Sequence, residues 1–203
     1  MVQVKVCGIT RAADAVAAVS LGATSIGFVF WPESRRYVTP DVAASIVQGV
    51  PTVRSVGVFV NSSVEEMHEV ADKVGLTSVQ LHGDESDDMH SQLSYPVIRA
   101  IGVVGESTIT RVDSVPQDVM VLLDVHDQVK RGGTGRTVDW DVAATIAAKR
   151  QIFLAGGLGP DNVAAAIRRV RPYGIDVSSG VEASPGIKET NKLKSLFCEV
   201  EQA

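Results

Sequence analysis

The sequence has very few cysteines, few aromatic residues and no long hydrophobic run. Its 203 residues include only two cysteines, Cys7 and Cys198, which are too few for a disulfide framework, so we expect a reducing, cytoplasmic setting. No stretch approaches the ~20 apolar residues of a membrane span, and the first residues lack the basic start and apolar run of a signal peptide. Aromatic residues make up only 5%, so the core must consist of valine, alanine, isoleucine and leucine.

An excess of positive charge is also missing. The formal net charge is −5, and the basic pairs at 130–131 and 168–169 are too short to form a basic tract. Nucleic acid is therefore excluded as the main partner, and we expect a small molecule instead. With 45% hydrophobic residues, the chain is too apolar for disorder and long enough to bury one substantial core.

The sequence does contain a recurring alternation of short β-rich runs and helical stretches. Most of the β-rich runs are continuously apolar, which indicates burial on both faces, as in parallel sheets. The predicted strands cover residues 2–7, 25–30, 55–60, 78–81, 97–101, 119–124, 151–155 and 174–177. Thr10 is predicted to cap the first helix. The other predicted helices begin near Pro40, Ser63, Asp84, Asp139 and Pro160, with a weak one over 106–115 and a last one over about 188–200.

This alternation is typical of both an open doubly wound sheet and a closed barrel. Eight strands favour closure, and no linker or shift in composition divides the chain, so we predict a single (β/α)8 TIM barrel domain over residues 1–203. The loops after the second and sixth strands are the longest. In such a barrel they lie on the C-terminal face, where active sites are built.

Glycine and serine cluster at the ends of the seventh and eighth strands. Gly156 and Gly157 follow the seventh strand, and Ser178, Ser179 and Gly180 follow the eighth. Glycine lets backbone N–H groups approach a ligand, hydroxyls add donors, and a short helix N-terminus adds partial positive charge. Either cluster alone could be a tight turn. Together, in the two loops that commonly bind phosphate in these barrels, they predict a phosphorylated small molecule.

Two residues at strand ends are candidates for proton transfer. Cys7 ends the first strand, where a thiol can serve as a base or nucleophile, although a buried structural cysteine is the commoner role. Asp124 ends the sixth strand after three apolar residues. Because burying an unpaired carboxylate is costly, we favour a general acid–base role over a helix cap or an ion pair.

Further polar residues complete the predicted substrate site. Arg35 and Arg36 lie in the long second loop, and a guanidinium suits bidentate capture of a carboxylate. His82, after the fourth strand, and Asp176, in the eighth, are also predicted to bind substrate. The histidines show no metal-ligand spacing, so we expect no metal. A glycine-rich loop at 132–135 is a candidate lid.

Seven motifs stand in order at the strand ends, each of them modest alone. The motifs of the first four strands are Lys-Val-Cys-Gly-Ile-Thr at 5–10, Gly-Phe-Val-Phe at 27–30 with Ser-Arg-Arg-Tyr-Val at 34–38, Val-Gly-Val-Phe-Val-Asn at 56–61, and Val-Gln-Leu-His-Gly-Asp-Glu at 79–85. The motifs of the last three strands are Leu-Asp at 123–124 with Gly-Gly-Thr-Gly at 132–135, Phe-Leu-Ala-Gly-Gly-Leu at 153–158, and Asp-Val-Ser-Ser-Gly-Val-Glu at 176–182. Together they resemble the phosphoribosylanthranilate isomerase family of tryptophan biosynthesis over essentially the whole chain.

The resemblance implies a minimal barrel, often without a full fifth helix, and a cofactor-free Amadori rearrangement. The substrate would be N-(5-phosphoribosyl)anthranilate and the product 1-(o-carboxyphenylamino)-1-deoxyribulose 5-phosphate. It implies Cys7 as general base, Asp124 as general acid and Arg36 as the partner of the anthranilate carboxylate. Arg35 stays an alternative to Arg36, because many family members have proline there. The residues implied at the phosphate are Gly157, Ser178, Ser179 and Gly180.

Three other functions are weighed against this one. Another phosphosugar enzyme, such as a ribulose-phosphate 3-epimerase, would be expected to pair histidines and aspartates at a metal, and no such pairing is evident. A non-catalytic receptor for a phosphorylated ligand would not need Cys7 and Asp124 together. A bifunctional enzyme acting on a substrate with two phosphates would need a second phosphate loop, which the sequence does not show. The expected assembly is a monomer or a weak homodimer.

Overall fold

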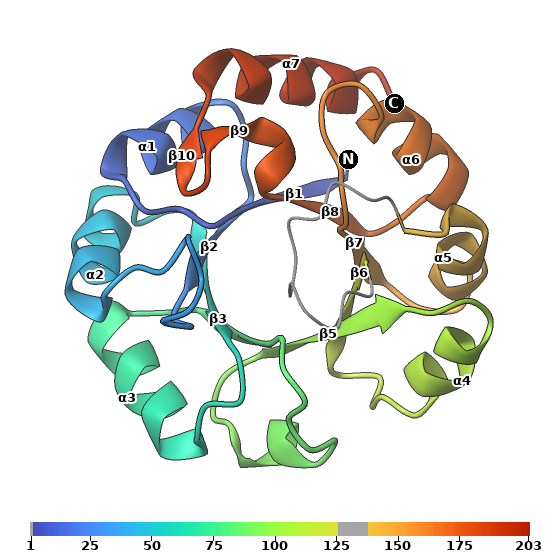
Figure 1. Ribbon diagram of the computed structural model, residues 1–203, viewed down its shortest axis with the longest axis horizontal. Helices are drawn as coiled ribbons and strands as arrows, with labels where there is room; N and C mark the ends of the chain where they lie inside the picture. The colour runs from blue at the N-terminus through green and yellow to red at the C-terminus, as the bar shows by residue number, and fades with distance from the viewer. Residues whose placement is uncertain (1, 126–137) are drawn as a thin grey trace.

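Eight parallel strands pair in the order of the chain, and the last strand pairs with the first, which closes a barrel (Figure 1). This computed structural model describes residues 2–125 and 138–203. The predicted closed (β/α)8 barrel is confirmed, whereas the predicted lid at 132–135 lies outside the described residues. The strands are β1 (Gln3–Cys7), β2 (Ser25–Val29), β3 (Arg54–Phe59), β4 (Ser78–Leu81), β5 (Val97–Val103), β6 (Met120–Val125), β7 (Ile152–Leu154) and β8 (Gly174–Val177).

Helices surround the barrel on its outside (Figure 1). They are α1 (Ala12–Ser20), α2 (Pro40–Gly49), α3 (Val64–Val74), α4 (Ser107–Asp113), α5 (Trp140–Ala147), α6 (Val163–Val170) and α7 (Thr190–Glu201). The helix after the fifth strand is α4, which has only seven residues and is therefore short, as expected. No helix in the described part of the chain is long and apolar enough to cross a membrane.

Local capping signals predicted several helix starts correctly. The predicted starts at Ser63 and Asp139 are confirmed, because both side chains accept hydrogen bonds from backbone N–H groups in the first turns of α3 and α5. Thr39, which was not predicted as a cap, does the same for α2. Pro40 occupies the first turn of α2, where its missing N–H is not needed. The prediction that Thr10 caps α1 is wrong, because its hydroxyl donates to the Gly186 carbonyl in a distant part of the chain.

The helix predicted to open near Asp84 is also absent. Its neighbour Glu85 is buried and accepts hydrogen bonds from the backbone N–H groups of Asn61 and Gly83 and from Arg99. These contacts hold the segment as a turn. A single 3-10 turn, η1 (Met89–Gln92), follows instead.

The apolar core has two parts. The larger part lies between the barrel and the helices, and a smaller cluster fills the inside of the barrel. The buried members of the inner cluster are Val56, Ile98, Leu122, Phe153 and Ala155. Toward the C-terminal side of this inner cluster, the residues inside the barrel become polar. The mouth of the barrel is therefore available for a ligand.

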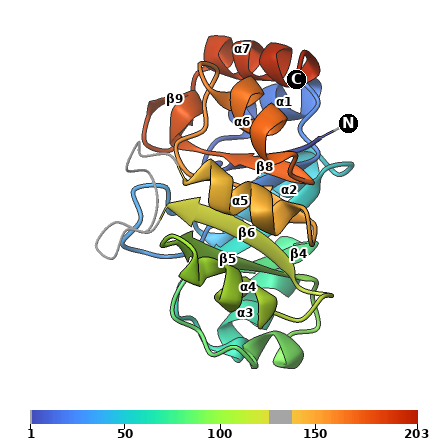
Figure 2. The same ribbon diagram turned by 90° about the vertical axis from the view of Figure 1, so that its right-hand side faces the viewer.

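Elements added after β8 build up one side of that mouth. A short 3-10 turn, η2 (Ser179–Val181), leads into an antiparallel hairpin of β9 (Glu182–Ser184) and β10 (Ile187–Lys188), which the sequence did not predict. In the side view, β9 and the loop after β2 project at the same end of the barrel (Figure 2). The hairpin therefore belongs to the face on which the site residues converge.

Candidate active site

A single cavity at the mouth of the barrel gathers nearly all of the predicted site residues. Its empty volume, counted together with the solvent-filled opening, is about 740 Å³. Gly180 and the alternative arginine, Arg35, are the predicted residues that are not among those lining the cavity. The predicted residues that line it are Cys7, Arg36, His82, Asp124, Gly156, Gly157, Asp176, Ser178 and Ser179.

Cys7 enters the cavity beside an ion pair. Lys5 lies two positions earlier on β1, so both side chains point to the same face of the strand. Its ammonium contacts Asp176 Oδ1 at 3.0 Å, and the two residues face each other in the β1–β8 register. Gly27 lies directly across from Cys7 on β2, and a Cβ there would come within 2.8 Å of the thiol sulfur and 3.2 Å of Lys5 Nζ. Because Gly27 has no side chain, it leaves room for the Cys7 thiol and the Lys5 ammonium.

Burial and charge act in opposite directions on the Cys7 thiol. Burial raises its pKa and the nearby Lys5 ammonium lowers it, and the net direction is upward. Cys7 therefore rests as a neutral thiol. Burial lowers the pKa of Lys5, but the charges of Asp176 and Cys7 and the hydrogen bonds to them together outweigh burial, so the net direction is again upward and Lys5 stays charged. A fixed positive charge thus lies next to the position where a thiolate would form.

Asp124 forms the end of a short polar chain across β4 and β6. The Gln80 amide donates to His82 Nδ1 at 2.8 Å, so a neutral His82 carries its proton on Nε2. That nitrogen lies 3.4 Å from Asp124 Oδ2, while Asp124 Oδ1 accepts a hydrogen bond from the Val125 N–H. The carboxyl group is held in place and still faces the cavity.

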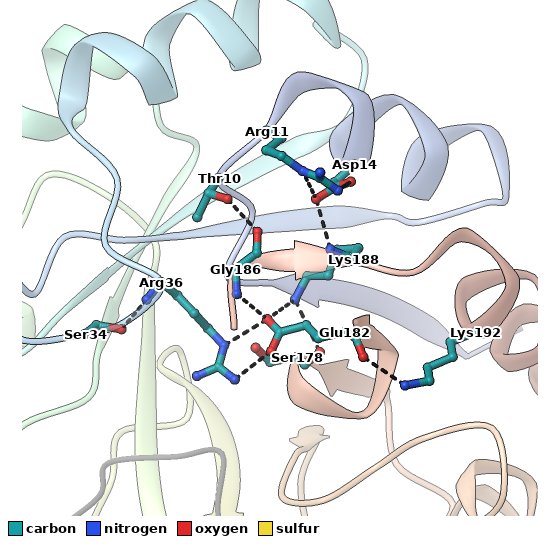
Figure 3. Close-up of polar contacts among 10 residues, drawn as sticks. All are labelled: Thr10, Arg11, Asp14, Ser34, Arg36, Ser178, Glu182, Gly186, Lys188 and Lys192. Atoms are coloured by element: carbon teal, nitrogen blue, oxygen red, sulfur yellow. Dashed lines mark hydrogen bonds and ion pairs between the residues drawn. The ribbon is translucent and has the colours of Figure 1, made fainter. Parts of the chain in front are cut away.

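Arg36 reaches the cavity across a glycine. Gly8 has φ +73°, and a Cβ at this position would lie 2.6 Å from Arg36 Cδ, so a larger residue would both strain the backbone and block the arginine. The guanidinium binds Glu182 through Nε at 2.9 Å and Nη2 at 2.7 Å (Figure 3). Of the two candidate arginines, Arg36 is the one that lines the cavity.

The two glycine- and serine-rich loops lie against each other. Gly156 and Gly157 both have positive φ angles, so the backbone leaves the extended conformation of β7 at this point. Gly180 does not line the cavity, and its role is contact between the loops, since a Cβ there would lie 2.0 Å from the Leu158 carbonyl oxygen. Ser178 and Ser179 remain at the cavity wall. The backbone of this corner has the space and donors that an anion requires.

Several residues at the site were not assigned a role from the sequence. Lys5 is the clearest, because a lysine within a buried strand signals a specific partner. Gln80 is also buried and lines the cavity, and its Oε1 has no hydrogen-bond partner within the described residues. Glu182 ends one of the motifs, but only the structure pairs it with Arg36. In the described part of the chain, no group of three or more histidine, cysteine or acidic side chains is placed to hold a metal ion.

Comparisons with known proteins show which family the chain resembles over its whole length. A family model described as N-(5'phosphoribosyl)anthranilate (PRA) isomerase matches residues 4–199. N-(5'-phosphoribosyl)anthranilate isomerase of Pelobacter propionicus is 48% identical over 97% of this chain and 94% of its own length. The crystal structure of phosphoribosyl anthranilate isomerase from Thermotoga maritima has a TM-score of 0.93 at 40% identity, with all of both chains covered. A second structure of such an isomerase, in complex with reduced 1-(o-carboxyphenylamino)-1-deoxyribulose 5-phosphate, has a TM-score of 0.89 at 39% identity, also with all of both chains covered.

Proposed function

The chain belongs to the N-(5'-phosphoribosyl)anthranilate isomerase family, and we propose that Cys7 and Asp124 at the mouth of its barrel carry out the proton transfers of that reaction. The enzyme is an isomerase of tryptophan biosynthesis. It converts N-(5'-phosphoribosyl)anthranilate to 1-(o-carboxyphenylamino)-1-deoxyribulose 5-phosphate, an aldose-to-ketose change that moves protons and leaves the carbon skeleton intact.

In the proposed first step, Asp124 acts as general acid. Its protonated carboxyl gives a proton to the ring oxygen of the ribose as the C1–O bond breaks, and the anilino nitrogen supplies the electron pair that forms an iminium. His82 and the Val125 N–H hold the carboxyl toward the cavity. A positioned acid of this kind typically contributes ~10²–10⁴-fold to the rate.

In the proposed second step, Cys7 acts as general base. The iminium acidifies the proton on C2, the Cys7 thiolate removes it, and the C–H electron pair forms the C1=C2 bond of an enolamine. Protonation at C1 and loss of the hydroxyl proton from C2 then give the ketone. The charge of Lys5 stabilises the thiolate, which a buried site would otherwise disfavour.

The two anionic ends of the substrate define its proposed orientation. The phosphate lies at the loops that carry Gly156, Gly157, Ser178 and Ser179, with Gly180 holding these loops together. The anthranilate carboxylate lies at Arg36. Asp176 and His82 contact the sugar between these two ends. No proton in this scheme needs a bound cofactor for its transfer.

The observation that carries the proposal is the meeting of an acid and a base in one cavity. Cys7 on β1 and Asp124 on β6 approach the same 740 Å³ space from different strands of the barrel. A receptor that only bound the phosphate would require the loops after β7 and β8 but neither of these groups.

An activity assay with substrate made in situ tests the proposal. N-(5'-phosphoribosyl)anthranilate is generated from anthranilate and phosphoribosyl pyrophosphate with the appropriate transferase, and its fluorescence decays as the isomerase consumes it. We expect the wild-type protein to turn over the substrate, and Cys7→Ala and Asp124→Asn to lose most turnover while remaining folded. A rate close to that of wild type in either variant would remove that residue from the scheme.

We also propose that the chain acts as a single barrel domain over residues 1–203, in the cytoplasm, as a monomer or weak homodimer. Cys7 and Cys198 are both free thiols, which fits a reducing compartment. The large exposed apolar side chains of the described residues are spread over several elements, and scattered exposure of this kind does not mark a large interface. Sedimentation at several concentrations tests the assembly.

A further inference from the structure

The hairpin after β8 places a buried carboxylate behind Arg36. The Glu182 side chain is only 4% exposed and does not line the cavity, whereas Arg36, which it binds, does. Glu182 Oε1 also accepts hydrogen bonds from Lys188 Nζ at 2.9 Å and from the Gly186 N–H at 3.2 Å (Figure 3). These contacts fix the position of the Glu182 carboxylate, which itself occupies no space in the cavity.

The charges of this group do not cancel. Glu182 supplies one negative charge to two cations, Arg36 and Lys188. Lys192, which donates to the Glu182 backbone carbonyl at 2.8 Å, is paired with Glu189 and adds nothing to this imbalance. Excess positive charge in a partly buried place is costly unless an anion compensates it. The open side of Arg36 faces the cavity, so the missing anion is expected there.

The geometry of the guanidinium shows where that anion would bind. Arginine has five N–H donors in one plane, and Glu182 takes Nε–H and one Nη2–H. The other edge of the fork, made by Nη1 and the second Nη2–H, has no hydrogen-bond partner among the described residues. That edge matches a second carboxylate in the bidentate arrangement that arginine favours.

The same network reaches the predicted phosphate loop. Lys188 Nζ, which binds Glu182, also donates to the Ser178 carbonyl oxygen at 3.2 Å (Figure 3). The Lys188 backbone N–H is held by Asp14 Oδ2 at 3.0 Å, which anchors the hairpin to α1. A short chain of contacts therefore joins the predicted binding points for the two anionic ends of the substrate.

We infer that Glu182 is a positioning residue that sets the plane of the Arg36 guanidinium, so that its open edge receives the aromatic carboxylate of the substrate. Through Lys188, the same carboxylate keeps this recognition point at a fixed distance from the phosphate loop at Ser178. The inference rests on the proposed role of Arg36 and extends it to a residue that does not touch the substrate.

The substitution Glu182→Gln removes the charge and keeps the size of the side chain. We expect the KM for N-(5'-phosphoribosyl)anthranilate to rise about 10-fold with kcat within about threefold, because binding rather than chemistry is impaired. The inhibition constant of anthranilate, which has only the carboxylate end, should rise about 10-fold. That of ribose 5-phosphate, which has only the phosphate end, should stay within about twofold.

A double-mutant comparison separates positioning from general damage. In an Arg36→Ala background, Glu182→Gln should change kcat/KM by less than about twofold, because the group through which it acts is gone. Glu189→Gln is the matched control. Among the described residues, the side chain of this glutamate on the same segment pairs with Lys192 alone, at the surface, and the kinetics of the variant should match wild type.

The possible outcomes are distinguishable. Wild-type protein that fails to consume the substrate would overturn the proposed function and this inference with it, and an unchanged KM in Arg36→Ala would overturn the role of Arg36 and the inference that rests on it. If the wild-type protein turns over the substrate and Arg36→Ala raises the KM, three results would overturn this inference alone. They are an unchanged KM in Glu182→Gln, equal weakening of both inhibitors by Glu182→Gln, and an effect of Glu182→Gln on kcat/KM that persists in the Arg36→Ala background. Should Glu182→Gln not fold, Glu182→Asp, which keeps the charge and retracts it by one methylene, is taken through the same comparison with the same criteria.

Discussion

At the scale of single residues, the main feature of this site is a thiol whose environment both hinders and enables its ionisation. Cys7 is buried, which raises its pKa, while Lys5 beside it holds a compensating charge that Asp176 keeps in place. When the pKa of a thiol is raised, its thiolate is a stronger base, but a smaller fraction of the thiol is ionised at neutral pH. The charge of Lys5 lowers the pKa of Cys7 and so partly offsets the effect of burial.

This environment predicts the pH dependence of the enzyme. Because the proposed scheme uses Cys7 as a thiolate and the pKa of this thiol is raised, kcat/KM should increase with pH through the neutral range and level off only in the alkaline range. Lys5→Met should lower kcat/KM at neutral pH by about 100-fold and move the alkaline limb to higher pH. The measurement is kcat/KM from pH 6 to 10 for both proteins.

Alkylation of the thiol gives an independent test of the same prediction. In a Cys198→Ser background, which removes the exposed thiol, the rate of reaction of Cys7 with iodoacetamide should follow the same rising curve. A pH profile that does not change with Lys5→Met would show that the lysine serves the fold and not the base.

The acid can be tested in isolation from substrate binding. Asp124→Asn preserves the shape and the hydrogen bond from the Val125 N–H but cannot supply the proton. We expect kcat to fall by ~10²–10⁴-fold with the affinity for the product within a few-fold of wild type. Asp118→Asn, at an exposed position just before β6, should leave kcat unchanged. A comparable fall in both variants would point to damage to the strand.

At the scale of elements, the loops after β7 and β8 depend on close backbone contact. A Cβ on Gly180 would lie 2.0 Å from the Leu158 carbonyl oxygen, so Gly180→Ala must push the two loops apart. We expect the KM for the phosphorylated substrate to rise more than about 10-fold and the inhibition constant of ribose 5-phosphate to rise with it. Gly49→Ala, where nothing lies within 4 Å, is the matched control and should leave both values unchanged. Equal behaviour of the two variants would contradict this role of Gly180.

Elements whose ends are determined locally could be predicted from the sequence, and those held by distant partners could not. Ser63 and Asp139 cap helices with bonds to N–H groups two or three positions away, so the signal lies in one short stretch. Thr10 has the same chemistry, but Gly186 of the hairpin engages its hydroxyl. The β9–β10 hairpin itself consists of five residues in two strands, which is too short for a periodic signal.

The candidate site follows the same division. The placement of Cys7 and Asp124 at the cavity could be predicted, because each lies at the end of a buried strand and the carboxyl ends of barrel strands meet at one face. Lys5 and Glu182 could not be given roles, because their partners are 171 and 146 positions away and become neighbours only when the barrel closes. Closure itself was predictable, since eight strand–helix units were visible along the chain.

At the scale of the whole molecule, the Glu182 network should make stability depend on acid. Burial alone would raise the pKa of Glu182, but hydrogen bonds and charge from Arg36 and Lys188 outweigh it and hold the pKa below its usual value. A carboxyl whose pKa is lower in the folded state stabilises the fold above its unfolded pKa, and this contribution is lost as the pH falls through the folded value. We therefore expect the free energy of unfolding to decrease as the pH falls below about 4.5, the usual value for glutamate.

Removing the titrating group should flatten this dependence. Glu182→Gln should be less stable than wild type at pH 7, and the difference between the two free energies of unfolding, from urea titrations at pH 7, 5, 4 and 3, should shrink toward acid. Glu69→Gln, at an exposed position on α3, should keep a constant difference from wild type. A Glu182→Gln curve parallel to that of wild type would mean that other carboxyls govern acid unfolding. Convergence of the two curves would show that the network which orients Arg36 also joins the β9–β10 hairpin, α1 and the loop after β2 into one cooperative structure. Loss of the single Glu182 charge would then lower the free energy of unfolding of the whole protein.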